Sequence, residues 1–295
     1  MTDLSPQAFR SLLKALTDQG GVFFLLGRSD VGKSTLVENL VRLVTARGQT
    51  VAVLDADLGQ STYGLPTTLN LVSFSPGIES PEPEMIARVF VGATSPVGHL
   101  LQTAVGCRRL LDRALGLGVR SIVIDTTGFV EGPLGLEFKL QKIDLLCPTH
   151  ILALAREDEL EPILRACVQR RDMTVHRLPV AAAARPRSPE ERRTNRQERY
   201  RHYFTDLTRY HFHSDDVAVW GRLPHRSSSD LTGLLVGLND GQGFCVGVGL
   251  FHGRTVRTVE VLLPAMAVQQ VRFLRFGSIA IDAEGNERFL SPREW

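Results

Sequence analysis

The feature that most constrains the fold is a glycine-rich segment that begins at Gly27. It reads Gly-Arg-Ser-Asp-Val-Gly-Lys-Ser and fits the phosphate-loop pattern G-x-x-x-x-G-K-[ST] in full. An apolar run over residues 21–26 precedes it, and residues 34–47 carry leucine and valine at helical spacing after it. This strand–loop–helix context predicts that backbone N–H groups and the helix N-terminus bind the phosphates of a nucleotide.

Two side chains of the loop have separate expected tasks. Lys33 should reach the β- and γ-phosphates and take part in catalysis, and the Ser34 hydroxyl should bind Mg²⁺. ATP or another nucleoside triphosphate is the expected phosphate donor, with Mg²⁺ as the cofactor. The predicted nucleotide-binding residues are Gly27, Arg28, Ser29, Asp30, Val31, Gly32, Lys33, Ser34 and Thr35.

A pair of acidic residues follows the next apolar strand, which is predicted over residues 50–55. Asp55 and Asp57 are two positions apart, so strand alternation places them on the same side at the edge of the sheet. One carboxylate could hold the Mg²⁺ shell while the other accepts a proton from an attacking hydroxyl. The alternative is two solvated loop acids.

A second acidic strand end supports a rival function. An apolar strand over residues 120–124 runs into Asp125-Thr-Thr-Gly128, the D-x-x-G pattern with which GTPases sense a γ-phosphate. A P-loop GTPase or ATPase acting as a regulatory switch is therefore an alternative. The guanine-reading motif [NT]-K-x-D is not matched, because the nearest string, Gln141-Lys142-Ile143-Asp144, lacks the Asn or Thr.

Alternation of strands and helices continues to about residue 210. Helices are predicted over residues 98–117 and 159–171 and a strand over residues 149–155, which indicates a doubly wound α/β domain. Short apolar runs follow at residues 217–223, 234–238, 244–250, 255–263 and 271–281. We expect a parallel-sheet P-loop domain over residues 1–210, with an arginine-rich helical segment at about 185–204, and a small all-β domain of unknown role over residues 211–295.

Composition excludes several other classes. The chain has 295 residues, of which 43% are hydrophobic and 22% charged, as in ordinary soluble proteins. No apolar run approaches the length of about 20 residues that a membrane-spanning helix needs, so we expect a cytoplasmic protein without a membrane partner. The four cysteines lie far apart and indicate reduced thiols. The net charge of +2 does not by itself imply nucleic acid, although only four of the 34 basic residues are lysines.

The arginine-rich segment begins with a strong helix start. Ser188 is a good N-cap, Pro189 suits the first helical position and Glu191 the third. In that register Arg192 and Arg196 lie on one face. Cations fixed on such a face could stabilise a transferring phosphate. A solvated, salt-bridged helix and a general nucleic-acid patch are the alternatives.

Taken together, the motifs resemble the P-loop polynucleotide 5′-hydroxyl kinases, a family that includes the RNA kinase subunit of the mRNA cleavage and polyadenylation machinery. The resemblance covers roughly residues 20–205 and is that of a short, prokaryotic-type member. It rests on five motifs in the family's order: Gly27–Ser34, Asp55-x-Asp57-x-Gly59-Gln60, Gly92-Ala-Thr94-Ser95-Pro96, Thr126-Thr-Gly128-Phe129, and Arg187-Ser188-x-x-x-Arg192-Arg193-x-x-Arg196.

The resemblance implies roles for individual residues. Asp57 is the expected general base, Asp55 assists the metal, and Arg187 and Arg192 are the catalytic lid arginines. Phe129 would stack on the terminal nucleotide as part of a clasp, although a plain core aromatic is the alternative. The residues expected to contact the acceptor strand are Gln60, Thr94, Ser95, Thr126, Gly128, Phe129 and Arg196.

The expected activity is transfer of a γ-phosphate to the 5′-hydroxyl of a single-stranded RNA or DNA end, and protein partners remain unknown. A nucleic-acid-binding adaptor with a degenerate kinase site is a further alternative, disfavoured because Lys33, Ser34, Asp57 and Arg192 are all present. Eukaryotic members of the family carry a β domain ahead of the P-loop that contributes to adenine binding. Only about twenty residues precede the first strand here, so loose donor specificity is expected.

Overall fold

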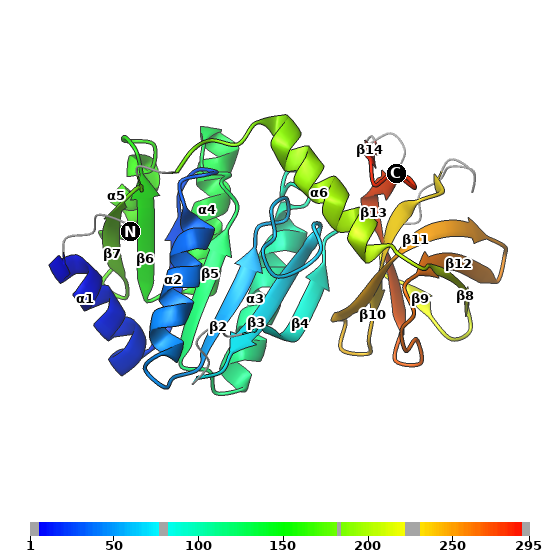
Figure 1. Ribbon diagram of the computed structural model, residues 1–295, viewed down its shortest axis with the longest axis horizontal. Coiled ribbons are helices and arrows are strands. Elements are labelled where there is room, and N and C mark those ends of the chain that lie inside the picture. The colour runs from blue at the N-terminus through cyan, green and yellow to red at the C-terminus, as the bar shows by residue number, and fades with distance from the viewer. Residues whose placement is uncertain (1–5, 77–81, 182–183, 222–230, 291–295) are drawn as a thin grey trace. The chain divides into compact units, whose positions relative to one another are not determined.

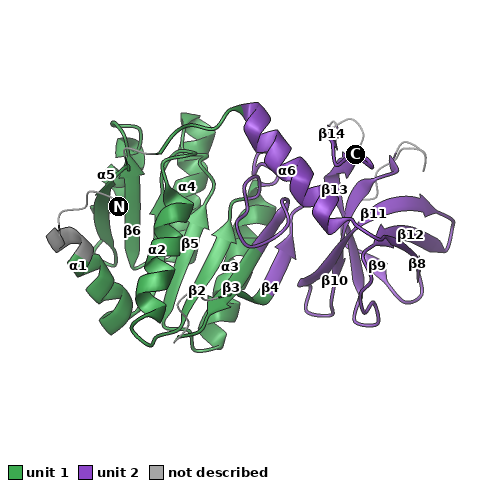
Figure 2. Cartoon of the chain, in the orientation of Figure 1, with its two compact units in different colours: residues 1–57, 70–86, 100–188 green, residues 58–69, 87–99, 189–295 purple. Residues whose placement is uncertain are grey.

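The chain falls into two compact units. The computed structural model describes residues 6–76, 82–181, 184–221 and 231–290. Unit 1 comprises residues 1–57, 70–86 and 100–188, and unit 2 comprises residues 58–69, 87–99 and 189–295 (Figure 2). Helix α6 (Pro189–Tyr203) and two earlier segments are grouped with unit 2, and the domain boundary expected near residue 211 stays a prediction.

The first sheet of the described chain has seven strands in the order β4-β3-β2-β5-β1-β6-β7 (Figure 1), and apart from residues 68–69 and 87–90 its strands belong to unit 1. The strands are β1 Gly21–Leu26, β2 Val51–Ala56, β3 Thr68–Phe74, β4 Glu84–Phe90, β5 Ser121–Thr126, β6 His150–Ala155 and β7 Thr174–Pro179. Pairing is parallel for β2–β5, β5–β1, β1–β6 and β6–β7, whereas β3 runs antiparallel to β2. The predicted α/β class is confirmed, with the correction that the sheet is mixed.

Helices cover both faces of this sheet. They are α1 Pro6–Lys14, continued by a π-helical turn η1 Ala15–Gln19, then α2 Lys33–Thr45, α3 Leu100–Gly116, α4 Gly132–Leu146 and α5 Glu161–Cys167. Crossovers between parallel strands are right-handed, so α2, which leads from β1 to β2, lies on one face. The helices α4 and α5 lead in the opposite direction along the sheet and lie on the other face.

Burial on both faces explains why the central strands read as apolar runs. Every residue of β2 and β5 is buried. Because β1, β2 and β5 are parallel neighbours, their carboxyl ends meet at one edge of the sheet. The glycine-rich loop, Asp57 and Asp125 are thereby collected at that edge.

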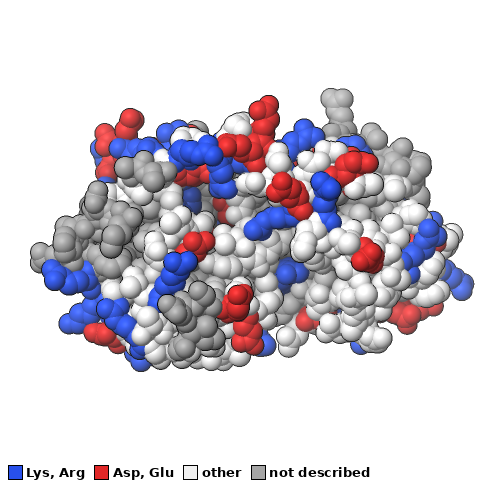
Figure 3. Space-filling model, in the orientation of Figure 1, with Lys and Arg blue, Asp and Glu red and all other residues white. Residues whose placement is uncertain are grey.

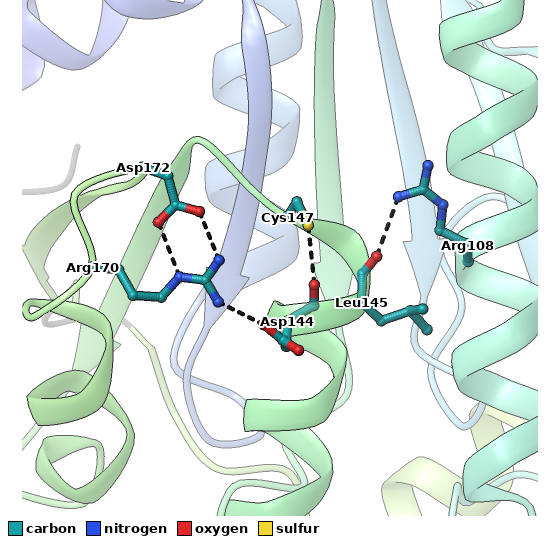
Figure 4. A network of polar contacts seen from close by, with 6 residues as sticks. All are labelled: Arg108, Asp144, Leu145, Cys147, Arg170 and Asp172. Atoms are coloured by element: carbon teal, nitrogen blue, oxygen red, sulfur yellow. Dashed lines mark hydrogen bonds and ion pairs between the residues drawn. The ribbon is translucent and has the colours of Figure 1, made fainter.

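The C-terminal end of α4 is fixed by a polar network (Figure 4). Cys147 follows the helix with φ +47°, and its thiol donates to the Asp144 carbonyl oxygen at 3.1 Å. Arg170 donates to an Asp144 carboxylate oxygen at 2.8 Å, and Arg108 of α3 donates to the Leu145 carbonyl oxygen at 3.2 Å. Exposed contacts of this kind contribute little energy singly, but together they fix the position of the helix end.

Unit 2 contains the second sheet and helix α6. The strands are β8 Thr208–His213, β9 Ala218–Val219, β10 Leu234–Asn239, β11 Cys245–Arg254, β12 Thr258–Leu263, β13 Phe273–Ile281 and β14 Glu287–Phe289. Six of them follow the order β14-β13-β10-β11-β12-β8 with antiparallel pairing, and β9 pairs with β13 in parallel. The expected all-β character of residues 211–295 is confirmed for the described residues.

One core of unit 2 combines residues that are far apart in the sequence. Leu65, Phe90 and Tyr200 are buried in one cluster with Leu235 of β10. The segment after β4 also pairs with β13, since the Ser278 N–H donates to the Gly92 carbonyl oxygen at 2.8 Å. This packing is the reason that residues 58–69, 87–99 and α6 belong with the β-sheet.

Candidate active site

The glycine-rich loop joins β1 to α2 with the backbone geometry that the motif requires. Gly32 has φ +91° immediately before α2, a conformation that favours glycine. A Cβ atom at Gly27 would lie 2.7 Å from the Leu154 carbonyl oxygen, so only glycine fits there without displacing the backbone. The predicted strand–loop–helix arrangement is confirmed, and α2 begins at Lys33.

Lys33 is buried and surrounded by carboxylates. Its Nζ donates to the carbonyl oxygens of Gly27 at 3.1 Å and Arg28 at 2.7 Å. Desolvation lowers the pKa of Lys33, whereas Asp125, Asp57 and Asp30, in decreasing order, act to raise it. The Lys33 amine therefore lies at the loop, held by two loop carbonyl oxygens and close to three carboxylates.

Ser34 and Asp125 form the contact that defines the metal side of the site. The Ser34 hydroxyl donates to Asp125 Oδ2 at 2.6 Å. Asp125 is almost fully enclosed, and burial raises the pKa of its carboxyl, while Lys33 and the Ser34 hydroxyl oppose that shift. Asp125 is the second-last residue of β5, the strand that pairs with β1. From the sequence, Asp125 was a candidate site residue only for the GTPase alternative.

The residues present fit a magnesium ion at this position. Asp125 Oδ1 is buried and has no hydrogen-bond partner among the described residues, so it can still accept an aqua ligand or bind a cation. Mg²⁺ is usually held by one or two protein oxygens together with phosphates and water. No cluster of three or more acidic, His or Cys ligands occurs in the described part of the chain.

Asp55 and Asp57 occupy different environments at the end of β2. Asp55 is fully buried, and its Oδ1 accepts the Asp57 N–H at 3.2 Å. Asp57 is half-buried and close enough to Lys33 and Asp125 to influence the pKa values of both. The visible task of Asp55 is to orient the turn that carries Asp57, and its predicted role as a metal ligand stays a prediction.

Arg187, one of the predicted lid arginines, contacts the P-loop within unit 1. Its Nε donates to Asp30 Oδ1 at 2.8 Å, and its backbone N–H donates to Asp30 Oδ2 at 3.1 Å. Asp30 is itself at φ +59° and its side chain is only 4% exposed. Arg187 therefore ties the segment that precedes α6 to the P-loop, although its side chain is still 41% exposed.

The predicted clasp residues Thr126, Gly128 and Phe129 follow β5. The Thr126 hydroxyl is buried and donates to the Leu25 carbonyl oxygen at 2.8 Å, so it acts within the fold. Gly128 lies against the P-loop, because a Cβ atom there would be 2.2 Å from the Ser29 nitrogen. The Phe129 ring is half-buried, which is compatible with both of its proposed roles.

Unit 2 holds the remaining predicted residues. The Gln60 side-chain amide donates to the Arg192 carbonyl oxygen at 3.3 Å, so these two residues are neighbours within the unit. Thr94 is half-buried and Ser95 is exposed, with the Ser95 hydroxyl accepting the Val97 N–H at 3.2 Å. Their predicted contacts to an acceptor strand stay predictions.

Arg196 is held by a buried ion pair in unit 2. Its Nε and Nη2 each donate to one carboxylate oxygen of Glu287 at 2.7 Å, in the bidentate geometry that suits arginine. The side chains of Arg196 and Glu287 are 16% and 3% exposed. The Arg196 guanidinium thus links α6 to the first residue of β14. The predicted contact of Arg196 with the acceptor strand stays a prediction.

The surface does not form a single basic face in the view of Figure 3. Lysine and arginine side chains alternate there with aspartate and glutamate, in keeping with the small net charge. Among the helices that the structure describes, none has the length and apolarity to cross a bilayer. The face in this view therefore shows no broad basic patch.

The fold and the loop define unit 1 as a P-loop nucleotide-binding domain of the phosphotransferase type. The chain belongs to the family described as mRNA cleavage and polyadenylation factor CLP1 P-loop, whose sequence pattern matches residues 27–206. This result confirms the predicted family.

Curated relatives resemble the chain over most of its length. A polyribonucleotide 5′-hydroxyl-kinase of Thermococcus kodakarensis is 30% identical, covering 98% of this chain and 97% of the relative. One of Pyrococcus abyssi is 29% identical, covering 92% of this chain and 90% of the relative. Among solved structures, the chain resembles that of the wild-type Clp1p–Pcf11p complex with a TM-score of 0.66 and 14% identity, covering 95% of this chain and 80% of that one. At this identity the structural likeness concerns the fold alone.

Proposed function

We propose that this chain is a nucleoside-triphosphate-dependent kinase that phosphorylates the 5′-hydroxyl end of RNA. The observation that carries the proposal is the Ser34–Asp125 hydrogen bond beside Lys33, at the carboxyl edge of the sheet where a phosphate and a metal ion would bind. The names of the archaeal relatives favour RNA as the acceptor. DNA ends are a second acceptor class that the same chemistry would accommodate.

The reaction joins the 5′-oxygen of the acceptor to the γ-phosphorus while the bond from that phosphorus to the β,γ-bridging oxygen breaks. Lys33 would bind the β- and γ-phosphate oxygens and offset the charge on the leaving nucleoside diphosphate. Asp57 would accept the proton of the 5′-hydroxyl, because it is the half-buried carboxylate beside Lys33. Ser34 and Asp125 would hold Mg²⁺, which supplies charge stabilisation to the phosphates when bound.

The two lid arginines would act on the transferring phosphate. Arg187 is tied to Asp30 of the P-loop in unit 1, and Arg192 lies five residues later, on the lid helix of unit 2. We assign Arg192 to the transition state from its place in the family's arginine motif and from the general use of arginine in phosphoryl transfer.

End-labelling tests the proposal directly. The protein should be incubated with Mg²⁺, γ-labelled ATP and oligonucleotides of either sugar type that carry a 5′-hydroxyl, with 5′-phosphorylated oligonucleotides as the matched control. We expect label at 5′-hydroxyl RNA ends and none on the control. Lys33→Met should abolish the transfer.

The alternatives give different results in the same assay. A P-loop GTPase or ATPase switch would release labelled inorganic phosphate without labelling any end. A nucleic-acid-binding adaptor would retain the oligonucleotide and neither transfer nor release label. Either outcome with folded, nucleotide-binding protein would refute kinase activity.

A further inference from the structure

Helix α4 buries two lysines that the proposed mechanism does not use. Lys139 and Lys142 are both 0% exposed, whereas Lys14, elsewhere in the chain, is exposed. An amine in an apolar layer is costly unless hydrogen bonds compensate for the lost water. The two lysines differ in this respect, and the difference indicates a task for one of them.

The Lys139 amine donates hydrogen bonds to two oxygens, one on the last residue of β5 and one in the turn that follows. Its Nζ donates to the Thr126 hydroxyl oxygen at 2.7 Å and to the Thr127 carbonyl oxygen at 2.7 Å. Burial is the largest cause of a pKa for Lys139 well below its ordinary value, and Lys142 and Lys33 lower it further. Asp57 and Cys107 act in the opposite direction. Two oxygens of this region thus accept hydrogen bonds from the buried Lys139 amine.

Lys142 has no comparable contacts. Its Nζ has no hydrogen-bond partner among the described residues. It lies over the rings of Phe24 and Phe138, 5.9 Å and 5.5 Å from their centroids. Lys142 therefore matches Lys139 in helix, burial and residue type, but not in its connection to the turn.

The same helix supports the turn through two further contacts. The Phe138 ring lies 6.3 Å from the Phe129 ring, centroid to centroid, at an angle of 46°. Gly135 approaches the turn closely, since a Cβ atom there would lie 3.0 Å from the Val130 carbonyl carbon. On its other side the turn meets the P-loop through Gly128, whose Cβ would overlap Ser29. The turn is thus bounded by α4 and by the P-loop.

We propose that Lys139 is a positioning residue, whose buried amine fixes the turn over residues 126–129 and so sets the place of Phe129 against the acceptor's terminal nucleotide. The proposal rests on the proposed kinase function. An apolar side chain of similar size would fill the same space but would leave the Thr127 carbonyl oxygen with only the longer contact of 3.4 Å from the Thr126 hydroxyl. The expected consequence is a poorly placed acceptor with an intact nucleotide site.

Lys139→Met and Lys142→Met form a matched pair for the test. In Lys139→Met the KM for a 5′-hydroxyl RNA oligonucleotide should rise about tenfold or more, because small misplacements near the reacting groups are costly. Its Kd for ATP, measured by calorimetry without acceptor, should stay within about twofold of the wild type. In Lys142→Met all kinetic constants should stay at wild-type values, and the Tm should be equal or higher because an unpaired amine is removed.

A second variant keeps the test decisive if Lys139→Met does not fold. Lys139→Gln retains two N–H donors at shorter reach and should recover part of the acceptor affinity. Thr126→Val removes one of the two acceptors, and its effect on acceptor KM should be non-additive with that of Lys139→Met or Lys139→Gln.

Several results would overturn the proposal. The proposal is wrong if Lys139→Met and Lys142→Met have the same KM for the acceptor. It is also wrong if Lys139→Met loses affinity for ATP and for the acceptor equally and has a lower Tm, because that pattern indicates general destabilisation. Full additivity with Thr126→Val would also overturn it. An inactive wild type would instead refute the kinase function itself, which separates the two failures.

Discussion

The phosphate loop and helix α6 both carry basic residues with a predicted part in catalysis, and these residues have different kinds of partner. At the loop, Lys33 and Ser34 contact neighbours at the same sheet edge, and the motif alone predicts their tasks. On α6, Arg196 is paired with Glu287, and Arg199 donates to the carbonyl oxygens of Gly64 and Thr62 at 2.8 Å and 3.3 Å. The shared helix face of arginines is therefore at least partly a packing surface within unit 2. The role of an arginine on α6 therefore depends on which residue, distant in the sequence, the fold brings next to it.

The largest expected effect separates Arg192 from the other arginines of its helix. If Arg192 meets the phosphoryl group only during transfer, Arg192→Ala should lower kcat and kcat/KM together by about 10³-fold with an almost unchanged acceptor KM. Arg192→Lys should rescue poorly, because it keeps the charge but loses the planar fork. Steady-state kinetics at two salt concentrations measure this. A rise in KM alone would show that Arg192 is only part of a basic patch.

The next effect concerns Arg196 and should appear in stability rather than in catalysis. Removing one partner of a buried ion pair leaves the other charge uncompensated, so Arg196→Ala should lower the free energy of unfolding by about 3 kcal/mol. Urea unfolding of Arg196→Ala and Glu287→Gln measures it, and both variants should be destabilised. If Arg196 contacts the acceptor instead, Arg196→Ala alone should raise the acceptor KM, and the two helix arginines would then share one role.

The catalytic base at the sheet edge gives the third effect. Asp57→Asn should spare nucleotide binding and lower kcat by at least ~10²-fold, the usual scale for a positioned proton acceptor. Asp55→Asn tests the other carboxylate of the same strand end, and its amide oxygen can still accept the Asp57 N–H that Asp55 Oδ1 accepts. Near-normal turnover in Asp57→Asn together with a large loss in Asp55→Asn would exchange the two roles.

The smallest expected effect belongs to Phe129. Phe129→Ala should weaken acceptor binding by ~1–3 kcal/mol, about equally for all four terminal bases, because stacking does not read base identity. Binding of 5′-hydroxyl oligonucleotides that differ only in the terminal base measures this. A lower Tm with unchanged acceptor affinity would instead assign the ring to the core.

Local elements of the fold were predictable, and their neighbours in space were not. Strand β1 and helix α2 follow from apolar spacing and agree with the structure to within a few residues. Helix α4 was not predicted, because glycines at 132 and 135 and a proline at 133 lie in its first turn, and two lysines interrupt its buried face. Strand β3 was also missed, since buried Thr68 and Asn70 interrupt its apolar run.

The metal side of the site shows the same limit more sharply. Asp55 and Asp125 both follow apolar strands, and the sequence gives no reason to prefer either as the partner of Ser34. The strand order decides, because β5 lies between β2 and β1 and so places Asp125 beside the loop. The Arg196–Glu287 pair likewise joins residues 91 positions apart, which no local pattern predicts.

The packing of Gly92 against Gly277 has a consequence for how the chain folds. A Cβ atom on Gly92 would lie 2.3 Å from the Gly277 Cα, and the Ser278 hydroxyl donates to the Gly92 carbonyl oxygen across 186 positions of sequence. Loops closed over such separations form slowly. During synthesis, Leu65 and Phe90 must wait for β10 and β13 before their core can close. Truncation near residue 211 would therefore expose the apolar side chains of Leu65 and Phe90 on the remaining chain. The β-sheet of unit 2 cannot be removed without opening the core that it shares with these two residues.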